Sequence, residues 1–149
     1  MNKKSEEIKT LIRVQSWTVD EQRRMLNQLL DREHVLIEDG KRMDLQLLAE
    51  QQVAAADPAM AGYSYVAFAK AHGIKRANIN VTLAALGTEI DRQRDAVAEA
   101  YRELKVLEEV QKNWLKAEQL EEARREQIDL DEIAQNLHRR HQALAGAEV

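Results

Sequence analysis

Residues 79–114, INVTLAALGTEIDRQRDAVAEAYRELKVLEEVQKNW, decide the fold of this chain. Alternating steps of four and three residues place one narrow stripe on this stretch, apolar except at two glutamines: Ile79, Leu83, Leu86, Ile90, Gln93, Val97, Ala100, Leu104, Leu107, Gln111 and Trp114. Charged side chains fill many of the positions between them. An average spacing of 3.5 residues is typical of a helix that pairs with another helix in a left-handed coiled coil. The stretch therefore predicts a long helix that needs a partner.

A second stripe of the same spacing lies in the N-terminal third of the chain, and eight of its twelve positions are apolar: Ile8, Ile12, Gln15, Val19, Gln22, Leu26, Leu29, Glu33, Leu36, Gly40, Met43 and Leu47. Polar residues inside such a stripe usually fix register, so Gln15, Gln22 and Glu33 are interpreted in this way rather than as a binding site. Gly40 on the stripe indicates a bend or a close approach of the two helices.

The fold-back is predicted from two signals. Asp57 is a good N-cap residue and Pro58 suits the first position of a helix. In an antiparallel pair the numbers of facing residues have a constant sum. Pairing the ends of the two stripes, Ile8 with Trp114 and Met43 with Ile79, gives 122 in both cases, which places the fold-back near residue 61.

Together these signals predict an all-α fold, a long antiparallel two-helix coiled-coil hairpin with an overhanging C-terminal helix, in a single domain over residues 1–149. The first helix is expected over about 5–55, the hinge over about 56–62 and the second helix over about 60–141. Residues 142–149 are expected to be a disordered tail.

The composition agrees with this architecture. Ala, Glu, Lys, Leu and Arg supply 77 of the 149 residues, which is typical of a long helix or coiled coil. The single proline and five glycines leave little to interrupt a helix. The chain has no cysteine and a net charge of −4 with both signs interleaved, so its bulk charge gives no reason to expect nucleic-acid binding.

The predicted tip carries half of the six aromatic residues, Tyr63, Tyr65 and Phe68. Residues 58–88 contain no acidic side chain, whereas Lys70, Lys75, Arg76 and His72 are basic or titratable. One interpretation is that the rings close the end of the hairpin. The other is a locally basic apolar surface that docks on another protein.

After Trp114 the first helix offers no further partner. Residues 116–127 are a charged helical stretch, and an apolar stripe then resumes at Ile128, Leu130, Ile133 and Leu137. If residues 115–142 are helical, they extend about 40 Å beyond the hairpin. This stripe is expected to need a partner from another molecule.

No catalytic site is predicted, because the sequence has no phosphate-binding glycine loop, nucleophile elbow or Glu-x-x-His carboxylate motif. No cofactor or metal is predicted either. His138 and His141, beside Arg139 and Arg140, are interpreted as a solvated basic helix end. Trp17 lies off the stripe, so it is either an exposed partner contact or a cover for Arg and Lys stems.

Several short segments resemble the flagellar export protein FliJ family and its injectisome counterparts. They are Leu11-Ile12-Arg13 followed by Trp17, Val19-Asp20-Glu21 and Arg23-Arg24; Ala-Asp-Pro at the hinge; Tyr65-x-x-Phe68 at the tip; and Leu130-Asp131-Glu132-Ile133-Ala134 followed by basic residues. The resemblance covers nearly the whole chain.

The resemblance implies a non-enzymatic, cytoplasmic component of the bacterial flagellar type III protein export apparatus, associated peripherally with the inner membrane through its partners. It implies a stalk that binds the hexameric export ATPase, reaches the cytoplasmic domain of the export gate and escorts export chaperones. Carried onto this sequence, the ATPase contacts are Leu130, Asp131, Glu132, Ile133 and Leu137. The gate contacts are Tyr65 and Phe68, and Trp17 is an exposed contact candidate.

Two alternatives remain open at this point. The chain could be a free-standing structural or regulatory coiled-coil adaptor that dimerises through its C-terminal helix, or an export-substrate chaperone without an ATPase contact. A dimer would show a concentration-dependent mass in sedimentation, whereas the stalk hypothesis expects a monomer. The sequence does not distinguish a flagellar from an injectisome system.

Overall fold

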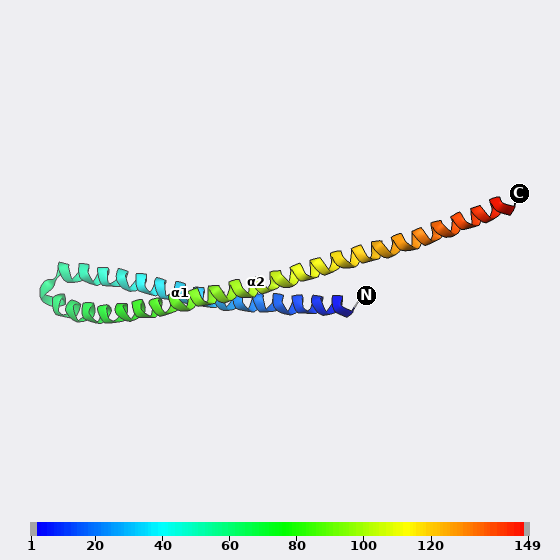
Figure 1. The fold of residues 1–149 in the computed structure, drawn as a ribbon. Helices are drawn as coiled ribbons and strands as arrows, with labels where there is room; N and C mark the ends of the chain where they lie inside the picture. Colours follow the sequence, from blue (N-terminus) through cyan, green and yellow to red (C-terminus); the bar gives the residue numbers. More distant parts are fainter. Residues whose placement is uncertain (1–2, 148–149) are drawn as a thin grey trace. The chain divides into compact units, whose positions relative to one another are not determined.

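The structure is a computed structural model that describes residues 3–147. It contains two α-helices, α1 (Lys3–Ala56) and α2 (Pro58–Ala147), with Asp57 alone between them (Figure 1). The predicted all-α helical hairpin is confirmed. Helix α2 continues to Ala147, past the end predicted near residue 141, because residues 142–147 contain no proline and are mostly strong helix formers. The last two residues of the predicted disordered tail, 148 and 149, lie outside the described residues.

The chain forms two compact units. One contains Val14–Leu104, and within it α1 and the first half of α2 run side by side in opposite directions (Figure 1). The other contains the remaining described residues, 3–13 of α1 and 105–147 of α2.

The turn follows the predicted cap chemistry. The Asp57 carboxylate accepts a hydrogen bond from the backbone N–H of Met60 at 3.4 Å, which is the N-cap contact to the third helical residue. The Asp57 carbonyl accepts the first backbone bond of α2, from Ala61 at 3.0 Å. Pro58 occupies the first helical position, where its missing N–H leaves no bond unmade. One residue therefore suffices to end α1 and begin α2.

The seam assignment from the sequence is confirmed by burial. All of the stripe positions predicted on the two helices are buried or half-buried, and the most deeply buried apolar side chains among them are Val19, Leu86, Ile90, Ala100 and Leu104. No side chain in the described part of the chain is shielded as fully as in a thick globular core, because only one layer of contact separates the seam from water. The hairpin is therefore stabilised by a thin, continuous seam.

The predicted pairing register is wrong by one heptad. Gln15 Nε2 donates to the carbonyl of Ala100 at 2.9 Å, and Gln93 Nε2 donates to the carbonyl of Gln22 at 3.0 Å. The residue numbers of each pair add up to 115 rather than to the predicted 122, so the fold-back falls between Asp57 and Pro58 instead of near residue 61. His72, and not Ile79, therefore lies opposite Met43. A shift of seven residues keeps every apolar side chain on the seam, so the stripes alone could not exclude the wrong register.

Polar contacts at the seam fit the interpretation of the stripe glutamines as register markers. Gln93 Nε2 also donates to Gln22 Oε1 at 2.7 Å, and Gln15 Nε2 also donates to Glu103 Oε2 at 3.2 Å. These bonds form only in the observed alignment. A slip by one heptad would leave half-buried amides without these partners, which costs free energy.

The close approach predicted at Gly40 is made by a side chain. A Cβ at Gly40 would lie 2.5 Å from Nη1 of Arg76, so the absent side chain leaves room for that guanidinium. Arg76 Nε donates to Asp44 Oδ1 at 3.1 Å, and Nη1 donates to Asn80 Oδ1 at 3.1 Å. His72 Nε2 lies 3.2 Å from the same Asp44 oxygen, without the alignment of a hydrogen bond. Asp44 thus links α1 to two side chains of α2 near the tip.

Candidate partner-binding surfaces

The candidate surfaces are exposed apolar faces rather than an enclosed site. In residues 3–147 no group of three or more acidic or histidine side chains is placed to hold a metal ion. The strongest candidates lie in three places: the end of the hairpin near residue 60, the C-terminal part of α2, and the outer face of α1 around Trp17.

At the end of the hairpin the three aromatic rings do not share one environment. Tyr63 is 92% exposed, whereas Tyr65 and Phe68 are half-buried. The heptad frame explains the burial of Tyr65, which lies on the backward extension of the α2 seam; Tyr63 and Phe68 lie off it, and Phe68 is next to the seam position 69. Tyr65 and Phe68, the residues singled out from the sequence, are thus partly covered by the hairpin and partly open.

Sequence reasoning missed two aliphatic side chains at this end. Met60 is 82% exposed and Val66 is 64% exposed, and together with Tyr63 they leave much apolar area in water. A signal was available, because all three residues fall outside the seam frame in a stretch that has no acidic residue between 58 and 88. Exposed apolar residues on an outer face indicate a partner-binding surface more strongly than residues on a seam that the other helix already covers.

The C-terminal part of α2 is exposed on every side. Each residue from 122 to 147 is exposed, although the segment is helical throughout. Its apolar side chains stand open to solvent: Ile128 at 49%, Leu130 at 60%, Ile133 at 56%, Leu137 at 53% and Leu144 at 68%. An apolar stripe of this kind gains its main stabilisation only when another surface covers it.

Charge is distributed unevenly along this segment. Seven acidic residues lie between 118 and 132, whereas the described residues after 132 have none and include Arg139 and Arg140. Asp131 accepts a hydrogen bond from Gln127 at 2.9 Å, and Arg139 donates to Asn136 at 2.8 Å. The predicted contact residues Asp131 and Glu132 therefore lie within the acidic half, beside the apolar stripe.

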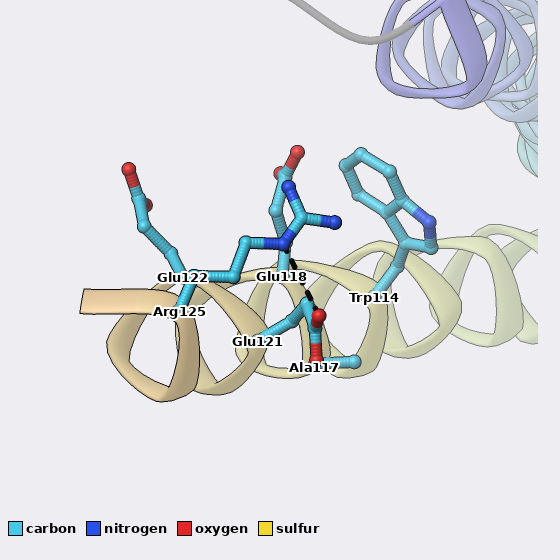
Figure 2. Close-up of a pocket in the computed structure, with 6 residues that line it drawn as sticks. All are labelled: Trp114, Ala117, Glu118, Glu121, Glu122 and Arg125. Atoms are coloured by element: carbon cyan, nitrogen blue, oxygen red, sulfur yellow. Dashed lines mark hydrogen bonds and ion pairs between the residues drawn. The ribbon is translucent and has the colours of Figure 1, made fainter. Parts of the chain in front are cut away.

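A shallow hollow beside α2 begins at Trp114, as Figure 2 shows. It is lined by Trp114, Ala117, Glu118, Glu121, Glu122 and Arg125. Arg124 donates two hydrogen bonds to Glu121, at 2.8 and 2.9 Å, and Arg125 donates one at 3.2 Å. These bonds, with that of Arg124 dominant, lower the pKa of Glu121 from 4.5 to about 2. The hollow is open and is built from one helix, so it is a feature of an acidic surface rather than an active site.

Trp17 and a nearby groove lie on different sides of α1. Trp17 is 66% exposed and belongs to the unit Val14–Leu104, which agrees with the prediction of an exposed residue. A groove runs along the seam on another face, lined by Val19, Arg23, Leu26, Arg94, Val97, Ala98 and Tyr101. Sequence reasoning did not identify this groove, because it requires the observed register to bring the two sets of residues together.

Comparison with known proteins identifies the family. A family model described as "Flagellar FliJ protein" matches residues 5–143 of the chain. The chain belongs to the FliJ family. No curated protein and no solved structure matches the chain significantly.

Membership of the FliJ family makes the chain a component of flagellar type III export, and it implies interactions within the export apparatus. The family is an export and structural family rather than a catalytic one. In the described part of this FliJ-family chain no helix is long and apolar enough to cross a membrane.

Proposed function

We propose that this FliJ-family chain acts as the stalk of the flagellar export machinery, binding the hexameric export ATPase through the C-terminal part of α2. The observation that carries the proposal is the exposure of every residue from 122 to 147 in a helix that bears an apolar stripe. A helix with such a stripe and no covering neighbour suits insertion into a ring. The apolar residues would supply binding free energy, and Asp131 and Glu132 would orient the helix against basic loops.

A second part of the proposal concerns the tip. Tyr65 and Phe68, which match the family's tyrosine-phenylalanine pair, would contact the cytoplasmic domain of the export gate. Met60, Tyr63 and Val66 are further exposed apolar side chains at this end of the hairpin. The lack of acidic residues between 58 and 88 would favour an acidic or neutral partner surface.

The proposal further includes escort of export chaperones and a cytoplasmic location, with the chain held at the inner membrane only through its partners. Trp17 is the candidate contact for a chaperone, because a tryptophan that is 66% exposed is costly to leave in water and is common at protein interfaces. Membership of the FliJ family supports chaperone escort as an expectation for this chain.

Co-purification with a purified hexameric export ATPase tests the main proposal. We expect the full-length chain to bind the ATPase and Ile133→Ser to weaken binding at least about tenfold, because the change removes a central apolar contact. Val81→Ser is the matched control, since Val81 is 70% exposed on α2 but lies in the unit Val14–Leu104. Equal binding by Ile133→Ser and the control would contradict the proposal.

A further inference from the structure

The last part of α2 carries a stripe of side chains whose residue types match when the stripe is reversed. Steps of three and four residues from Ala123 select Ala123, Glu126, Leu130, Ile133, Leu137, Arg140 and Leu144. Within residues 123–144, which are helical throughout, these positions form a single stripe, because residues three and four apart lie on the same helix face. The stripe runs for three heptads and is the narrow kind that a coiled-coil partner covers.

Reversal of this stripe matches it to itself. In an antiparallel pair centred near Ile133, each Leu130 faces Leu137 of the other copy and small Ala123 faces large Leu144, and the residue numbers of both pairs add up to 267. Ile133 lies beside the two-fold axis, close to its own equivalent, because its pair and the Glu126–Arg140 pair add up to 266 and are offset from the other pairs by one residue, about 1.5 Å. The two polar members also match, because Glu126 of each copy faces Arg140 of the other. A C2 interface requires this self-complementarity, in which residue i contacts j and j contacts i.

The Glu126 and Arg140 side chains are available for an ion pair with a second copy of the chain. Several neighbouring charged or polar side chains are engaged within α2: Arg124 and Arg125 with Glu121, Gln127 with Asp131, and Arg139 with Asn136. Over the described residues 3–147, Glu126 and Arg140 have no ion pair or side-chain hydrogen bond, and both are exposed. Charged residues on a coiled-coil stripe fix the orientation of the partner when opposite charges meet.

In a parallel dimer, like charges would face each other. It would bring Glu126 beside Glu126 and Arg140 beside Arg140, and like charges across an interface are unfavourable. We therefore propose that residues 123–144 of α2 form an antiparallel coiled coil with the same segment of a second copy of this chain, held by Leu130–Leu137 contacts and reciprocal Glu126–Arg140 ion pairs. The interface is small, so the association is weak and concentration-dependent.

The pairing has a consequence that rests on the proposed function. It covers Leu130, Ile133 and Leu137, the residues proposed for the ATPase ring, so the copy-to-copy contact and the ring contact exclude each other. The dimer would be unable to bind the ATPase and would dissociate when the ATPase ring binds residues 123–144 of one copy. This modifies the expectation of a monomer: the free chain associates reversibly at high concentration and enters the ring as a monomer. Sedimentation and distance measurements on the chain alone test the dimer, and co-purification with the ATPase tests the stalk separately.

Sedimentation of the full-length chain at concentrations up to roughly 300 µM is the first test. We expect a reversible rise in average mass, and Glu126→Arg or Arg140→Glu alone should weaken the association about tenfold or more, because each puts like charges together. The double variant Glu126→Arg with Arg140→Glu should restore it. Glu118→Arg is the control for Glu126→Arg, since it changes the net charge by the same amount outside the paired segment. A chain that stays monomeric at every concentration, or a double variant no better than the single ones, would overturn the proposal.

A distance measurement then tests the orientation. The chain has no cysteine, so Glu118→Cys introduces one site for a spin label. Because residue 118 lies 15 positions before Ile133, two labels in the antiparallel dimer should be about 45 Å apart at 1.5 Å per residue. In a parallel dimer they would lie within roughly 20 Å, the width of two helices. The short distance would refute the antiparallel pairing even if the chain dimerises.

Discussion

At the scale of the residue, the absence of a side chain at Gly40 of α1 makes room for Arg76 of α2, and this contact forms only in the observed register. The guanidinium occupies the space that a side chain at position 40 would need, and it is held there by Asp44 and Asn80. Glycine inside a helix costs about 1 kcal/mol relative to alanine. The ion pair of Arg76 with Asp44, whose side chains are 28% and 51% exposed, contributes about 0–1 kcal/mol to stability. The two effects are of similar size, so Gly40 is retained at little net cost.

This balance gives a prediction for Gly40→Ala. In the wild-type background the new methyl group should displace Arg76 from Asp44, so the unfolding free energy should change by less than about 0.5 kcal/mol. With Arg76→Ala already present, the same change should stabilise the chain by about 1 kcal/mol, because only the helix-propensity gain remains. Urea unfolding of the four chains in this cycle measures the coupling. Equal effects in both backgrounds would show that Arg76 does not occupy this space in solution.

A second residue-scale prediction concerns Glu121. Its pKa, lowered to about 2 by hydrogen bonds from Arg124 and then Arg125, lies below that of the same group in the unfolded chain. The support that this ion pair gives to the helix is therefore present above about pH 4.5 and is lost as the pH falls toward about 2. NMR titration should show the pKa of Glu121 rising toward 4.5 in Arg124→Gln, and rising less in Arg125→Gln. Arg139→Gln, about five turns along α2, should leave it unchanged.

At the scale of the element, the seam of α2 determines the stability of the hairpin. Leu86 and Ile90 are 4% and 3% exposed, so replacement of either by Ala should lower the unfolding free energy by about 2–4 kcal/mol. Values near the lower limit are expected, because water reaches one side of the thin seam. Val81→Ala, at a position that is 70% exposed, should change it by less than about 0.5 kcal/mol. If thermal or urea unfolding shows the same stability for Val81→Ala as for the Leu86→Ala or Ile90→Ala variant, the seam assignment is contradicted.

The beginning of α2 supplies a prediction about the tip. Tyr65→Ala and Phe68→Ala should weaken binding to the cytoplasmic domain of the export gate and leave the helix content near that of the wild type. Tyr63→Ala separates the two interpretations of this surface, because the Tyr63 ring is 92% exposed and supports no packing. Binding by calorimetry and helix content by circular dichroism are the measurements. If Tyr65→Ala and Phe68→Ala unfold the chain while Tyr63→Ala does not, the half-buried rings close the hairpin and are not the docking residues.

At the scale of the whole molecule, the chain contains a unit that buries its own seam, Val14–Leu104, and a helical segment, residues 122–147, in which every residue is exposed. A chain ending at Leu115 should keep the unit Val14–Leu104 folded, because this unit is compact and contains the most deeply buried seam residues, among them Leu86 and Ile90. The same truncation should abolish binding to the export ATPase and stimulation of its activity. Circular dichroism and an ATPase assay test the two halves of this expectation. Full stimulation by the truncated chain would place the ATPase contact elsewhere.

Hydrogen exchange examines the same division in the intact chain. Amides of the seam around Leu86–Leu104 should exchange slowly, whereas those of residues 128–137 should exchange quickly in a dilute monomer, because a lone helix is marginal in water. Addition of the ATPase should slow exchange in 128–137. Strong protection of that segment in a dilute monomer would mean that it already has a partner within the chain.

The sequence by itself determined which face of each helix is buried. Heptad spacing is a local property, so Leu86, Ile90 and Gly40 could be placed on the seam from their positions alone. The cap residues Asp57 and Pro58 likewise identified the turn, since capping depends on a few consecutive residues. The lengths of the two helices also predict that the stripe at Leu130, Ile133 and Leu137 is exposed, because α1 is too short to provide a partner for all of α2.

Only the tertiary structure decided the register. Seven-residue slips of one helix along the other leave every apolar side chain on the seam, so the apolar free energy changes little between them. What separates the alignments is the set of specific contacts across the seam, such as Gln22 with Gln93 and Arg76 with Asp44 over Gly40. Each of these contacts joins residues more than thirty positions apart, and no local pattern records which distant polar groups will meet. The apolar stripes therefore specify that the helices pair, and the polar contacts and the one-residue turn specify where.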